Sequence, residues 1–398
     1  MKLGIVREGK TPPDKRVPFS PKQCSEIIKK FNISLVVQPS PIRAYTDEEY
    51  TDLGITLQEN LSDCDILMGV KEVEIKDLID NKHYFFFSHT IKKQPYNSNL
   101  LKAFLDKKIK LTDYETLTHK GGGRILGFGR YAGIVGAYNG LLAWGKRNST
   151  FDLKPANLCE DFEELKIELK KVSLGNTKIV LTGEGRVAKG AIEIMNLINI
   201  KEVTSKDFIF QEHLTPVYTQ LKCNNYYKHK EGKEFDLQHL FNNPTEYKSR
   251  FKKYTQGSDI FISCHYWDHN AATLFSTEDT QDEKFSLKVI ADITCDIQGS
   301  VPTTIRASTI DKPIYGYNPQ TGAEGAPFSP GNITVMAVDN LPCELPRDAS
   351  ADFGTALLKN IIPAIAGNDT TEIINRASIT DKGELNNGYE YLSEYAKS

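Results

Sequence analysis

Short apolar runs alternate with helix-like stretches along the first third of the chain, and this alternation restricts the fold more than any other feature. LGIVRE, ISLVVQP, CDILMGVKE and HYFFFSH are typical of buried strands, whereas PKQCSEIIKKF carries apolar residues at helical spacing. Strands that alternate with helices form parallel sheets with helices on both faces. The sequence therefore predicts the α/β class.

A second α/β unit begins at TKIVLTGEGRVAKGAIEIM and continues through SDIFISCHYW and LKVIADITCD. A polar stretch precedes it, so we expect a first domain of residues 1–145, completed by the C-terminal helix 341–398. The second domain is expected to span residues 146–340, with a polar and aromatic excursion near 210–258. We predict that both domains are Rossmann-like with parallel sheets, and that the active site lies in the cleft between them.

Length and composition exclude several classes of protein. The 398 residues suffice for two domains, and 39% hydrophobic with 25% charged residues is typical of a soluble globular protein. A formal net charge of −3, with no basic run among aromatics, predicts no nucleic-acid partner. No run is long enough for a signal peptide or a membrane span, so we expect a cytoplasmic protein with no membrane partner.

The cysteines indicate neither a metal site nor a disulfide framework. The chain has seven of them, and no two form a CxxC pair. Structural zinc sites and small disulfide-rich domains both need closely and regularly spaced cysteines. We therefore predict reduced thiols and no bound metal.

One strand of the second unit leads directly into a glycine-rich turn and then a helix. In KIVLTGEGRVAKGAIEIM this turn comprises Gly183, Gly185, Arg186, Val187 and Ala188, in a GxGxxA pattern. The first glycine turns the chain, the second lets backbone N–H groups approach a pyrophosphate, and the third small residue lets helix and strand pack. The helix N-terminus then presents unpaired amides to the phosphate. These five residues are predicted to bind a dinucleotide, although such turns also occur without a ligand.

The same pattern calls for an acidic residue about 20 positions further on, at the end of the second strand, to bind the ribose hydroxyls. Asp207 is nearest to that spacing, but the strand can also end earlier, within Thr204, Ser205 and Lys206. The predicted cofactor is therefore NAD or NADP, and the sequence does not decide between them.

Ionisable side chains follow several predicted strands of the first domain. Lys71, His89 and Glu115 stand at or just beyond strand ends, and Arg16 and Arg124 lie in adjoining loops. The carboxyl ends of parallel strands line one rim of a sheet, so Lys71, His89 and Glu115 can converge there. These residues also have structural explanations: a solvated cap for Lys71, local hydrogen bonding for His89, and weak surface ion pairs for Arg16 and Glu115.

Seven motifs occur together and in order: GVKEVE, FFFSHTIKKQPYN, LTDYETL, GGGRILGFGRYAG, SCHYWDHNAATL, ADITCDIQGSVP and VDNLPCELPRDAS. This series resembles the lysine–ketoglutarate reductase domain of the bifunctional aminoadipate semialdehyde synthase. It is similar, more distantly, to the lysine-forming saccharopine dehydrogenases and the alanine dehydrogenases. The likeness extends over nearly the whole chain, from Arg16 to about Pro363.

The departures from these patterns favour the reductase branch. Fungal saccharopine dehydrogenases have two consecutive arginines where this chain has Gly123 and Arg124, whereas the reductase domain has only the second arginine. The excursion YYKHKEGKEFDLQHLFNNPTEYKSRF also resembles the reductase domain. No second catalytic module follows residue 398, so we expect a free-standing version of that domain.

The resemblance implies that the protein interconverts saccharopine with L-lysine and 2-oxoglutarate through an imine and hydride transfer. Motif positions carry over Lys71 and His89 as an acid/base pair, with Glu115 beside them to tune it. Histidine suits proton transfer near neutral pH, whereas lysine needs a lowered pKa.

Saccharopine carries three carboxylates, so the implied site needs cations. Arg16 and Arg124 are the best candidates because guanidinium binds carboxylate through two parallel hydrogen bonds, and Lys92 is a weaker third. Asp339 matches a position close to the nicotinamide half of the cofactor, although it can equally be a cap before a helix.

Two other functions remain open. The first is an alanine-dehydrogenase-like or opine-type dehydrogenase with another amine and oxo-acid pair, because the same chemistry serves any imine reduction. The second is a non-catalytic dinucleotide sensor that kept the fold. The sequence also leaves the physiological direction open, and it does not decide between a monomer and a homo-oligomer. The small-residue helix over 127–145 can pack against the cofactor domain or against a second subunit.

Overall fold

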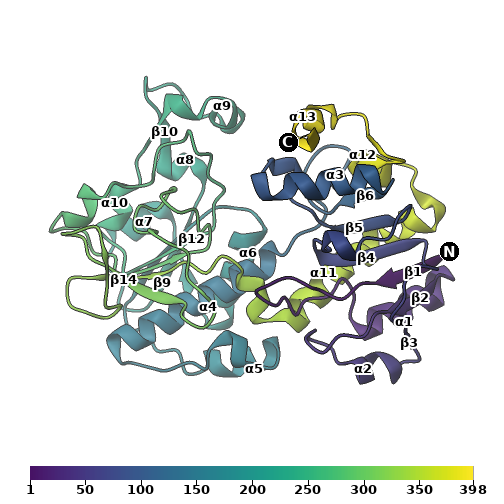
Figure 1. Cartoon of the computed structure of the whole chain (residues 1–398). Helices are drawn as coiled ribbons and strands as arrows, with labels where there is room; N and C mark the ends of the chain where they lie inside the picture. The colour runs from purple at the N-terminus through teal and green to yellow at the C-terminus, as the bar shows by residue number, and fades with distance from the viewer. Residues whose placement is uncertain (398) are drawn as a thin grey trace. The chain divides into compact units, whose positions relative to one another are not determined.

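The computed structural model describes residues 1–397 and contains two compact units (Figure 1). Unit 1 consists of Met1–Phe128 and Pro346–Ser398, and unit 2 consists of Gly129–Leu345. Each unit is built on its own eight-stranded, mostly parallel sheet. The predicted α/β class with two parallel sheets is confirmed. No described helix has the length and apolar character that crossing a membrane requires.

The sheet of unit 1 has the order β18-β17-β6-β5-β4-β1-β2-β3. The strands from β3 to β6 are parallel, and β17 and β18 add an antiparallel edge. Their bounds are β1 Lys2–Ile5, β2 Ser34–Val37, β3 Thr56–Leu57, β4 Ile66–Lys71, β5 His83–Phe87, β6 Lys110–Asp113, β17 Ser378–Asp381 and β18 Glu384–Leu385. The helices are α1 Pro21–Phe31, α2 Asp47–Thr51, α3 Ser98–Asp106, α11 Pro346–Asn360, α12 Ile373–Ala377 and α13 Ser393–Lys397.

The sheet of unit 2 has the order β15-β14-β16-β13-β12-β7-β9-β8, in which β14 is antiparallel to both of its neighbours, β16 and β15. The strands are β7 Lys178–Thr182, β8 Lys201–Glu202, β9 Val217–Leu221, β12 Ile260–Ser263, β13 Val289–Asp292, β14 Ile314–Tyr317, β15 Glu324–Gly325 and β16 Ile333–Met336. A separate hairpin pairs β10 Tyr227–His229 with β11 Tyr247–Ser249. The helices are α4 Gly129–Asn148, α5 Phe162–Leu169, α6 Arg186–Leu197, α7 Ser205–Phe210, α8 Cys223–Tyr226, α9 Leu237–Asn242 and α10 Lys252–Thr255.

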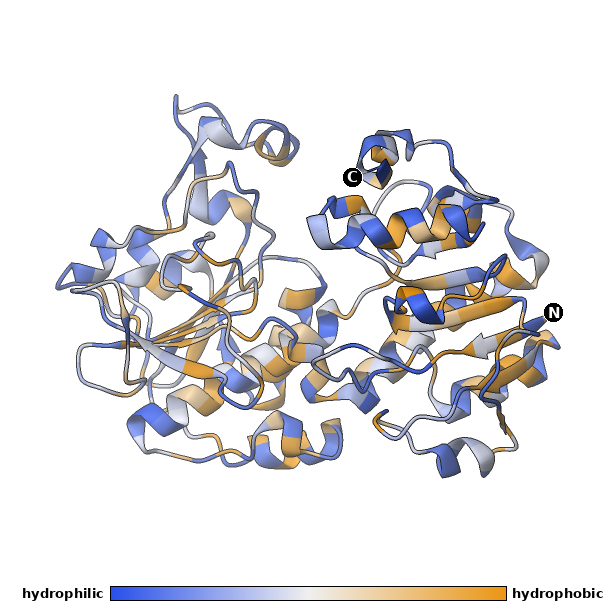
Figure 2. Cartoon of the chain, in the orientation of Figure 1, coloured by the Kyte–Doolittle hydropathy of each residue, from blue (hydrophilic) through white to orange (hydrophobic). Residues whose placement is uncertain are grey.

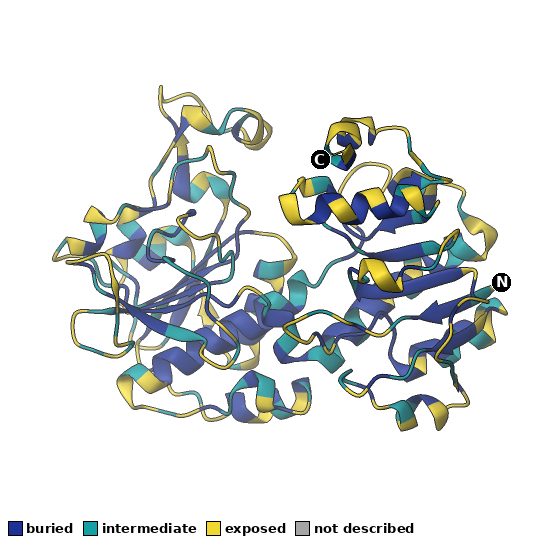
Figure 3. Cartoon of the chain, in the orientation of Figure 1, coloured by how far each residue is buried: buried dark blue, intermediate teal, exposed yellow. Residues whose placement is uncertain are grey.

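The central strands of both sheets are apolar on both faces, as parallel strands covered by helices must be. In unit 1 the burial of Leu3, Leu67, Phe85 and Phe86 is complete, and in unit 2 the strand β12 is buried at every position. Figures 2 and 3 show the result, with hydrophobic and buried ribbon concentrated in the strands of each sheet. Each unit therefore has a core of its own.

The small residues of α4 serve packing within unit 2. A Cβ on Gly133 would lie 1.9 Å from the carbonyl oxygen of Val187, and one on Gly190 of α6 would lie 2.0 Å from the carbonyl oxygen of Arg130. Helices α4 and α6 thus cross with their backbones in contact, which only glycine permits. The sequence left open whether this helix packs against the cofactor domain or against a second subunit. In the structure it packs against α6, the helix that follows the glycine turn.

This packing moves the boundaries between the two units. Because α4 packs on α6 and β13, it belongs to unit 2, and the boundary lies at 128/129 instead of the expected 145/146. The return to unit 1 lies at 345/346 instead of 340/341. The sequence placed α4 with the first domain because a polar stretch followed it, although its glycines fit the next unit. The functional assignment of each unit remains a prediction.

Candidate functional site

Three predicted residues of unit 1 lie at neighbouring strand ends. Lys71 is the last residue of β4, His89 lies two residues beyond β5, and Glu115 lies two residues beyond β6. Lys71 is the register partner of Phe87, the last residue of β5. The parallel order β4-β5-β6 therefore brings the three residues to the same edge of the sheet.

Glu115 is the centre of a charged cluster at this edge. Its Oε2 lies 3.3 Å from His89 Nδ1, and its Oε1 lies 3.2 Å from Lys92 Nζ and 3.2 Å from Arg124 Nη1. Its side chain is only 5% exposed. Burial opposes ionisation of this carboxyl, but the hydrogen bond with His89 and the charges of Lys92 and Arg124 outweigh it and lower the pKa to about 2. Glu115 is thus an anion surrounded by three groups that carry or accept protons.

The turn after β5 aims His89 at this cluster. His89 has the left-handed backbone conformation, with φ 57° and ψ 10°, which is uncommon outside glycine. The preceding Ser88 is fully buried, and its backbone N–H and hydroxyl both donate to Asp113 Oδ2, at 2.9 and 2.5 Å. Asn97 Nδ2 donates to the Ser88 carbonyl oxygen at 3.2 Å. These bonds secure the turn on both sides of the histidine.

Asp113 is a positioning residue that the sequence analysis did not identify. While Oδ2 accepts from Ser88, Oδ1 accepts the backbone N–H of Glu115 at 2.7 Å. One buried carboxyl therefore sets the chain direction before both His89 and Glu115, and burial raises its pKa. Its signal was present in LTDYE, as an acidic residue at the end of an apolar strand.

Glu8 is a second residue that the sequence patterns did not single out, and it orients the backbone at Lys71. Its Oε1 accepts from the N–H of Val70 at 2.7 Å, and its Oε2 accepts from the N–H of Lys71 at 2.9 Å. The β4–β5 pairing shifts register between Met68 and Lys71, so these amides face a side chain instead of a strand. Burial, together with the charge of Asp14, raises the pKa of Glu8 to about 8.

Arg16 lies in a separate, buried ion pair. Its Nε and Nη2 bind the two carboxylate oxygens of Asp14, at 3.0 and 2.6 Å, and its guanidinium lies 4.2 Å from the centre of the Phe128 ring. Arg16 is 3% exposed, whereas the side chains of Lys92 and Arg124 are 45% and 56% exposed. Of the three predicted carboxylate-binding cations, Lys92 and Arg124 are therefore the more accessible.

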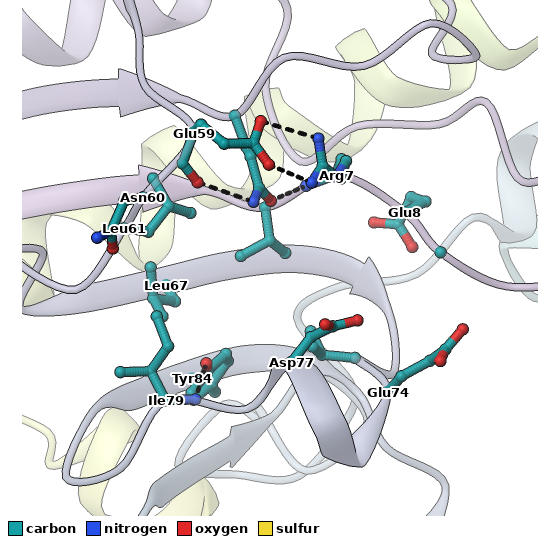
Figure 4. Close-up of a pocket in the computed structure, with 14 residues that line it drawn as sticks. Arg7, Glu8, Glu59, Asn60, Leu61, Leu67, Glu74, Asp77, Ile79 and Tyr84 are labelled. Atoms are coloured by element: carbon teal, nitrogen blue, oxygen red, sulfur yellow. Dashed lines mark hydrogen bonds and ion pairs between the residues drawn. The ribbon is translucent and has the colours of Figure 1, made fainter.

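A pocket of about 310 Å³ in unit 1 lies outside this cluster (Figure 4). Glu8 contributes to its wall, together with Glu59, Glu74 and Asp77, but none of the three predicted strand-end residues does. Its cation Arg7 is bound by Glu59, with Nη1 to Oε2 at 3.0 Å. The pocket is therefore acidic, and it does not contain the predicted catalytic residues.

The glycine turn of unit 2 has the expected form. Gly183 follows β7 with φ +100°, and a Cβ there would lie 2.5 Å from the carbonyl oxygen of Cys264, so the turn requires glycine. A Cβ on Gly185 would have no atom within 4 Å, so this position is open. Helix α6 begins at Arg186, and Ala188 is buried behind it. The described geometry leaves room for a ligand at the N-terminus of this helix.

Asp207 does not occupy the position predicted for a ribose ligand. It lies half-buried in α7, where its carboxylate accepts from Thr204 Oγ1 and Gln211 Nε2, both at 2.8 Å. The strand beside β7 is β9, which ends at Leu221, level with Thr182. The expected spacing of about 20 residues between the glycine turn and the end of the next strand does not apply, because β8 and α7 lie between α6 and β9 in the chain.

The residue that follows β9 is Lys222, and it lies close to the glycine turn. Its Nζ is 2.9 Å from Glu184 Oε1, and the side chains are 63% and 46% exposed. Gln220 Nε2 also donates to the Gly183 carbonyl oxygen at 2.7 Å. A cation thus stands where the dinucleotide fingerprint places an acid.

Asp339, the last predicted cofactor residue, is exposed and lies three residues beyond the end of β16. It is close enough to Cys295 to help raise the pKa of that thiol, which burial raises most. Neighbouring β13 ends at Asp292, so Asp339 lies at the carboxyl-end edge of this parallel region. Its role toward a cofactor remains a prediction.

Comparisons with known proteins agree with the motif series. Residues 4–135 match the family model described as alanine dehydrogenase/PNT, N-terminal domain. The alpha-aminoadipic semialdehyde synthase of Arabidopsis thaliana is 30% identical, over 100% of this chain and 42% of that protein. The L-lysine-forming, NAD(+) saccharopine dehydrogenase of Yarrowia lipolytica is 26% identical, over 98% of this chain and 99% of the relative. The chain thus spans less than half of the plant relative but nearly all of the yeast one.

Solved structures support the same fold. A structure titled L-alanine dehydrogenase superposes with a TM-score of 0.65 at 14% identity, covering all of both chains. The transhydrogenase from Sinorhizobium meliloti gives a TM-score of 0.60, also at 14% identity, over 97% of this chain. At such low identity these structures establish the fold alone.

Proposed function

We propose that the chain is an amino acid dehydrogenase-type oxidoreductase of the lysine–ketoglutarate reductase and saccharopine dehydrogenase family, and that it interconverts saccharopine with L-lysine and 2-oxoglutarate. Its similarity to relatives with these names supports the proposal. The observation that carries the proposal is the Glu115 cluster at the strand ends beside Lys71. Reductive amination needs proton donors and acceptors next to cations that hold carboxylates, and this edge of unit 1 supplies both.

In the proposed reaction, the lysine ε-amine attacks the oxo carbon of 2-oxoglutarate to form a carbinolamine. Loss of water then leaves an imine, and its reduction forms the secondary amine of saccharopine. A bound nicotinamide dinucleotide supplies the hydride. We assign the proton transfers to Lys71 and His89: one group deprotonates the amine, and one protonates the departing hydroxyl.

The other residues of the cluster then have defined roles. Ionised Glu115 holds His89 through Nδ1, which leaves Nε2 for proton exchange with the substrate. Lys92 and Arg124 are accessible enough to turn from Glu115 toward substrate carboxylates. Arg16, which is bound by Asp14, contributes positive charge from a fixed position.

In unit 2, we propose that the glycine turn and the N-terminus of α6 bind the cofactor pyrophosphate. Lys222 takes the position beside the adenosine ribose. An ammonium group there attracts a 2′-phosphate, whereas the acid of the usual fingerprint repels it. We therefore propose a preference for NADP over NAD.

Absorbance at 340 nm tests the proposal. Purified protein is mixed with NADPH or NADH and 2-oxoglutarate, with and without L-lysine, and lysine-dependent oxidation is expected, faster with NADPH. Activity only with ammonia and pyruvate, or with another amine and oxo-acid pair, would replace the substrate assignment by the alanine-dehydrogenase-like or opine-type alternative. If the protein binds the cofactor but turns over no amine and oxo-acid pair, the remaining explanation is a non-catalytic dinucleotide sensor.

A further inference from the structure

Three side chains of the hairpin region in unit 2 form a group with the composition of a metal site. His229 is the last residue of β10, Glu246 directly precedes β11, and His239 lies in α9. One ligand atom of each lies within 4.8 Å of the others, the single such group of three among residues 1–397. His229 Nε2 is 3.1 Å, and His239 Nε2 is 3.8 Å, from Glu246 Oε2. Two imidazoles and one carboxylate are a ligand set of open zinc sites.

The fold holds two of these groups in place without help from an ion. His229 faces Tyr247 across the hairpin, is only 3% exposed, and packs its ring edge to face on Tyr247 at 5.3 Å. His239 lies in the first turn of α9, whose N-cap Asp236 accepts its backbone N–H at 2.6 Å. The ligand atoms therefore come from a secured strand and a capped helix turn.

The hydrogen bonds of His239 leave Nε2 free to act as a ligand. Tyr247 Oη donates to the Asp236 carbonyl oxygen at 3.1 Å, so its lone pair accepts from His239 Nδ1, which is 3.2 Å away. The neutral ring then carries its proton on Nδ1 and directs the Nε2 lone pair at Glu246. A cation between the Nε2 lone pair and the Glu246 carboxylate stabilises these two electron-rich groups. The hydrogen bond from His239 Nδ1 to Tyr247 Oη is of the kind that orients metal-bound histidines.

His229 has to exchange one hydrogen bond to become a ligand. Its Nδ1 now accepts the backbone N–H of Glu231 at 3.2 Å, so its Nε2–H donates to Glu246. Coordination through Nε2 moves the ring proton to Nδ1 and releases the Glu231 amide. Glu231 is exposed, so water can take up that amide. This exchange makes the expected affinity moderate.

We propose that His229, His239 and Glu246 bind a divalent transition-metal ion, with Zn²⁺ as the best fit and water as the fourth ligand. Zn²⁺ binds imidazole nitrogen readily, accepts carboxylate oxygen, and favours tetrahedral geometry. It can enter from solvent because the side chains of His239 and Glu246 are 39% and 46% exposed. The bound ion fastens α9 to the β10–β11 hairpin. The proposal does not depend on the proposed function, and it adds a site that cysteine spacing could not reveal.

The test is metal titration of the full-length protein after treatment with a chelator. Calorimetry with Zn²⁺ is expected to show one saturable site, and Co²⁺ is expected to give a tetrahedral visible spectrum without a thiolate charge-transfer band. His239→Gln and Glu246→Gln are each expected to weaken binding at least tenfold. The control His269→Gln, a histidine that is 84% exposed in its side chain and outside the group, is expected to bind like the parent protein.

Unchanged zinc affinity in both ligand variants, or no saturable binding by the parent protein, would overturn the proposal. A cobalt spectrum with a thiolate band would also overturn it, since the seven cysteines would then be the binding groups. Thermal unfolding monitored by circular dichroism checks that each variant is folded. If His239→Gln unfolds, Glu246→Gln decides the matter, because its partly exposed carboxylate is replaced by an amide of the same shape.

Discussion

The strand-end cluster of unit 1 and the glycine turn of unit 2, the two proposed ligand sites, are built in different ways. In unit 1, Glu115 follows β6 and is paired with His89 and Lys92, which follow β5, and with Arg124 from a loop. In unit 2, the main features are backbone ones: the left-handed Gly183, the open Gly185 and the first amides of α6. The difference matches the two proposed roles, because proton transfer needs particular side chains held together, whereas phosphate binding relies on backbone N–H groups that no side chain covers.

Lys71→Met and His89→Gln are expected to separate the roles of the two regions most clearly. Each is expected to lower kcat by about 10²–10⁴-fold while cofactor affinity stays unchanged, because the loss concerns proton transfer alone. Steady-state rates at 340 nm and fluorescence titration of the cofactor measure the two effects. The matched control is His119→Gln, an exposed histidine of the same unit outside the cluster. Full turnover in His89→Gln would remove this residue from the mechanism.

The glycine turn can be dissected with two alanine variants. In Gly185→Ala the new Cβ meets no protein atom, so the free energy of unfolding is expected to stay within about 0.5 kcal/mol of the parent value. Cofactor affinity is expected to fall by about tenfold or more, because the Cβ occupies space proposed for the pyrophosphate. Gly183→Ala is expected to lower both, because its Cβ collides with Cys264 and its φ is positive. Unchanged cofactor affinity in a folded Gly185→Ala protein would argue against pyrophosphate binding at this turn.

Substitutions of Lys222 test whether a side chain of unit 2 decides between NADPH and NADH. Lys222→Asp is expected to shift the ratio of kcat/KM for NADPH over NADH toward NADH by about tenfold or more, since it removes an attractive charge and adds a repulsive one. Lys222→Gln separates the two contributions and is expected to give a smaller shift. Lys206→Asp, an exposed lysine in α7, serves as the control. An unchanged ratio in Lys222→Asp would show that the cofactor ribose lies elsewhere.

The smallest expected effect concerns the charge of Glu115. Its pKa in the folded protein is about 2, below the ordinary value, so its ionisation stabilises the fold at pH values above about 4.5 and is lost as pH falls toward 2. Glu115→Gln is expected to lower the free energy of unfolding by about 1–2 kcal/mol at pH 7, allowing for screening by solvent.

Denaturant unfolding at pH 7 and at pH 3 measures this difference. The gap between Glu115→Gln and the parent protein is expected to narrow at the lower pH, because this carboxyl is then protonated in the unfolded chain while it is still largely ionised in the folded protein. A gap that is equal at both pH values would show that shape and hydrogen bonding at this position matter, and not charge.

The sequence predicted local features well and distant neighbours poorly. The strand, turn and helix around Gly183 follow one another within a few residues, so pattern alone located them. The same pattern failed at Asp207, because the strand beside β7 is decided by pairing with β9 and not by distance along the chain. Asp113 and Glu8 were missed for a similar reason, since their importance lies in amides that the fold brings to them.

The sequence by itself determined the α/β class, the positions of the strand-end residues and the glycine turn, because these depend on periodicity and on neighbours in the chain. Only the tertiary structure decided that Glu115 contacts His89, Lys92 and Arg124, that α4 packs with unit 2, and that Lys222 directly follows a strand beside the turn. Ion pairs, helix crossings and strand order join residues far apart in the chain, and the energy that selects them comes from packing and burial that no local pattern records.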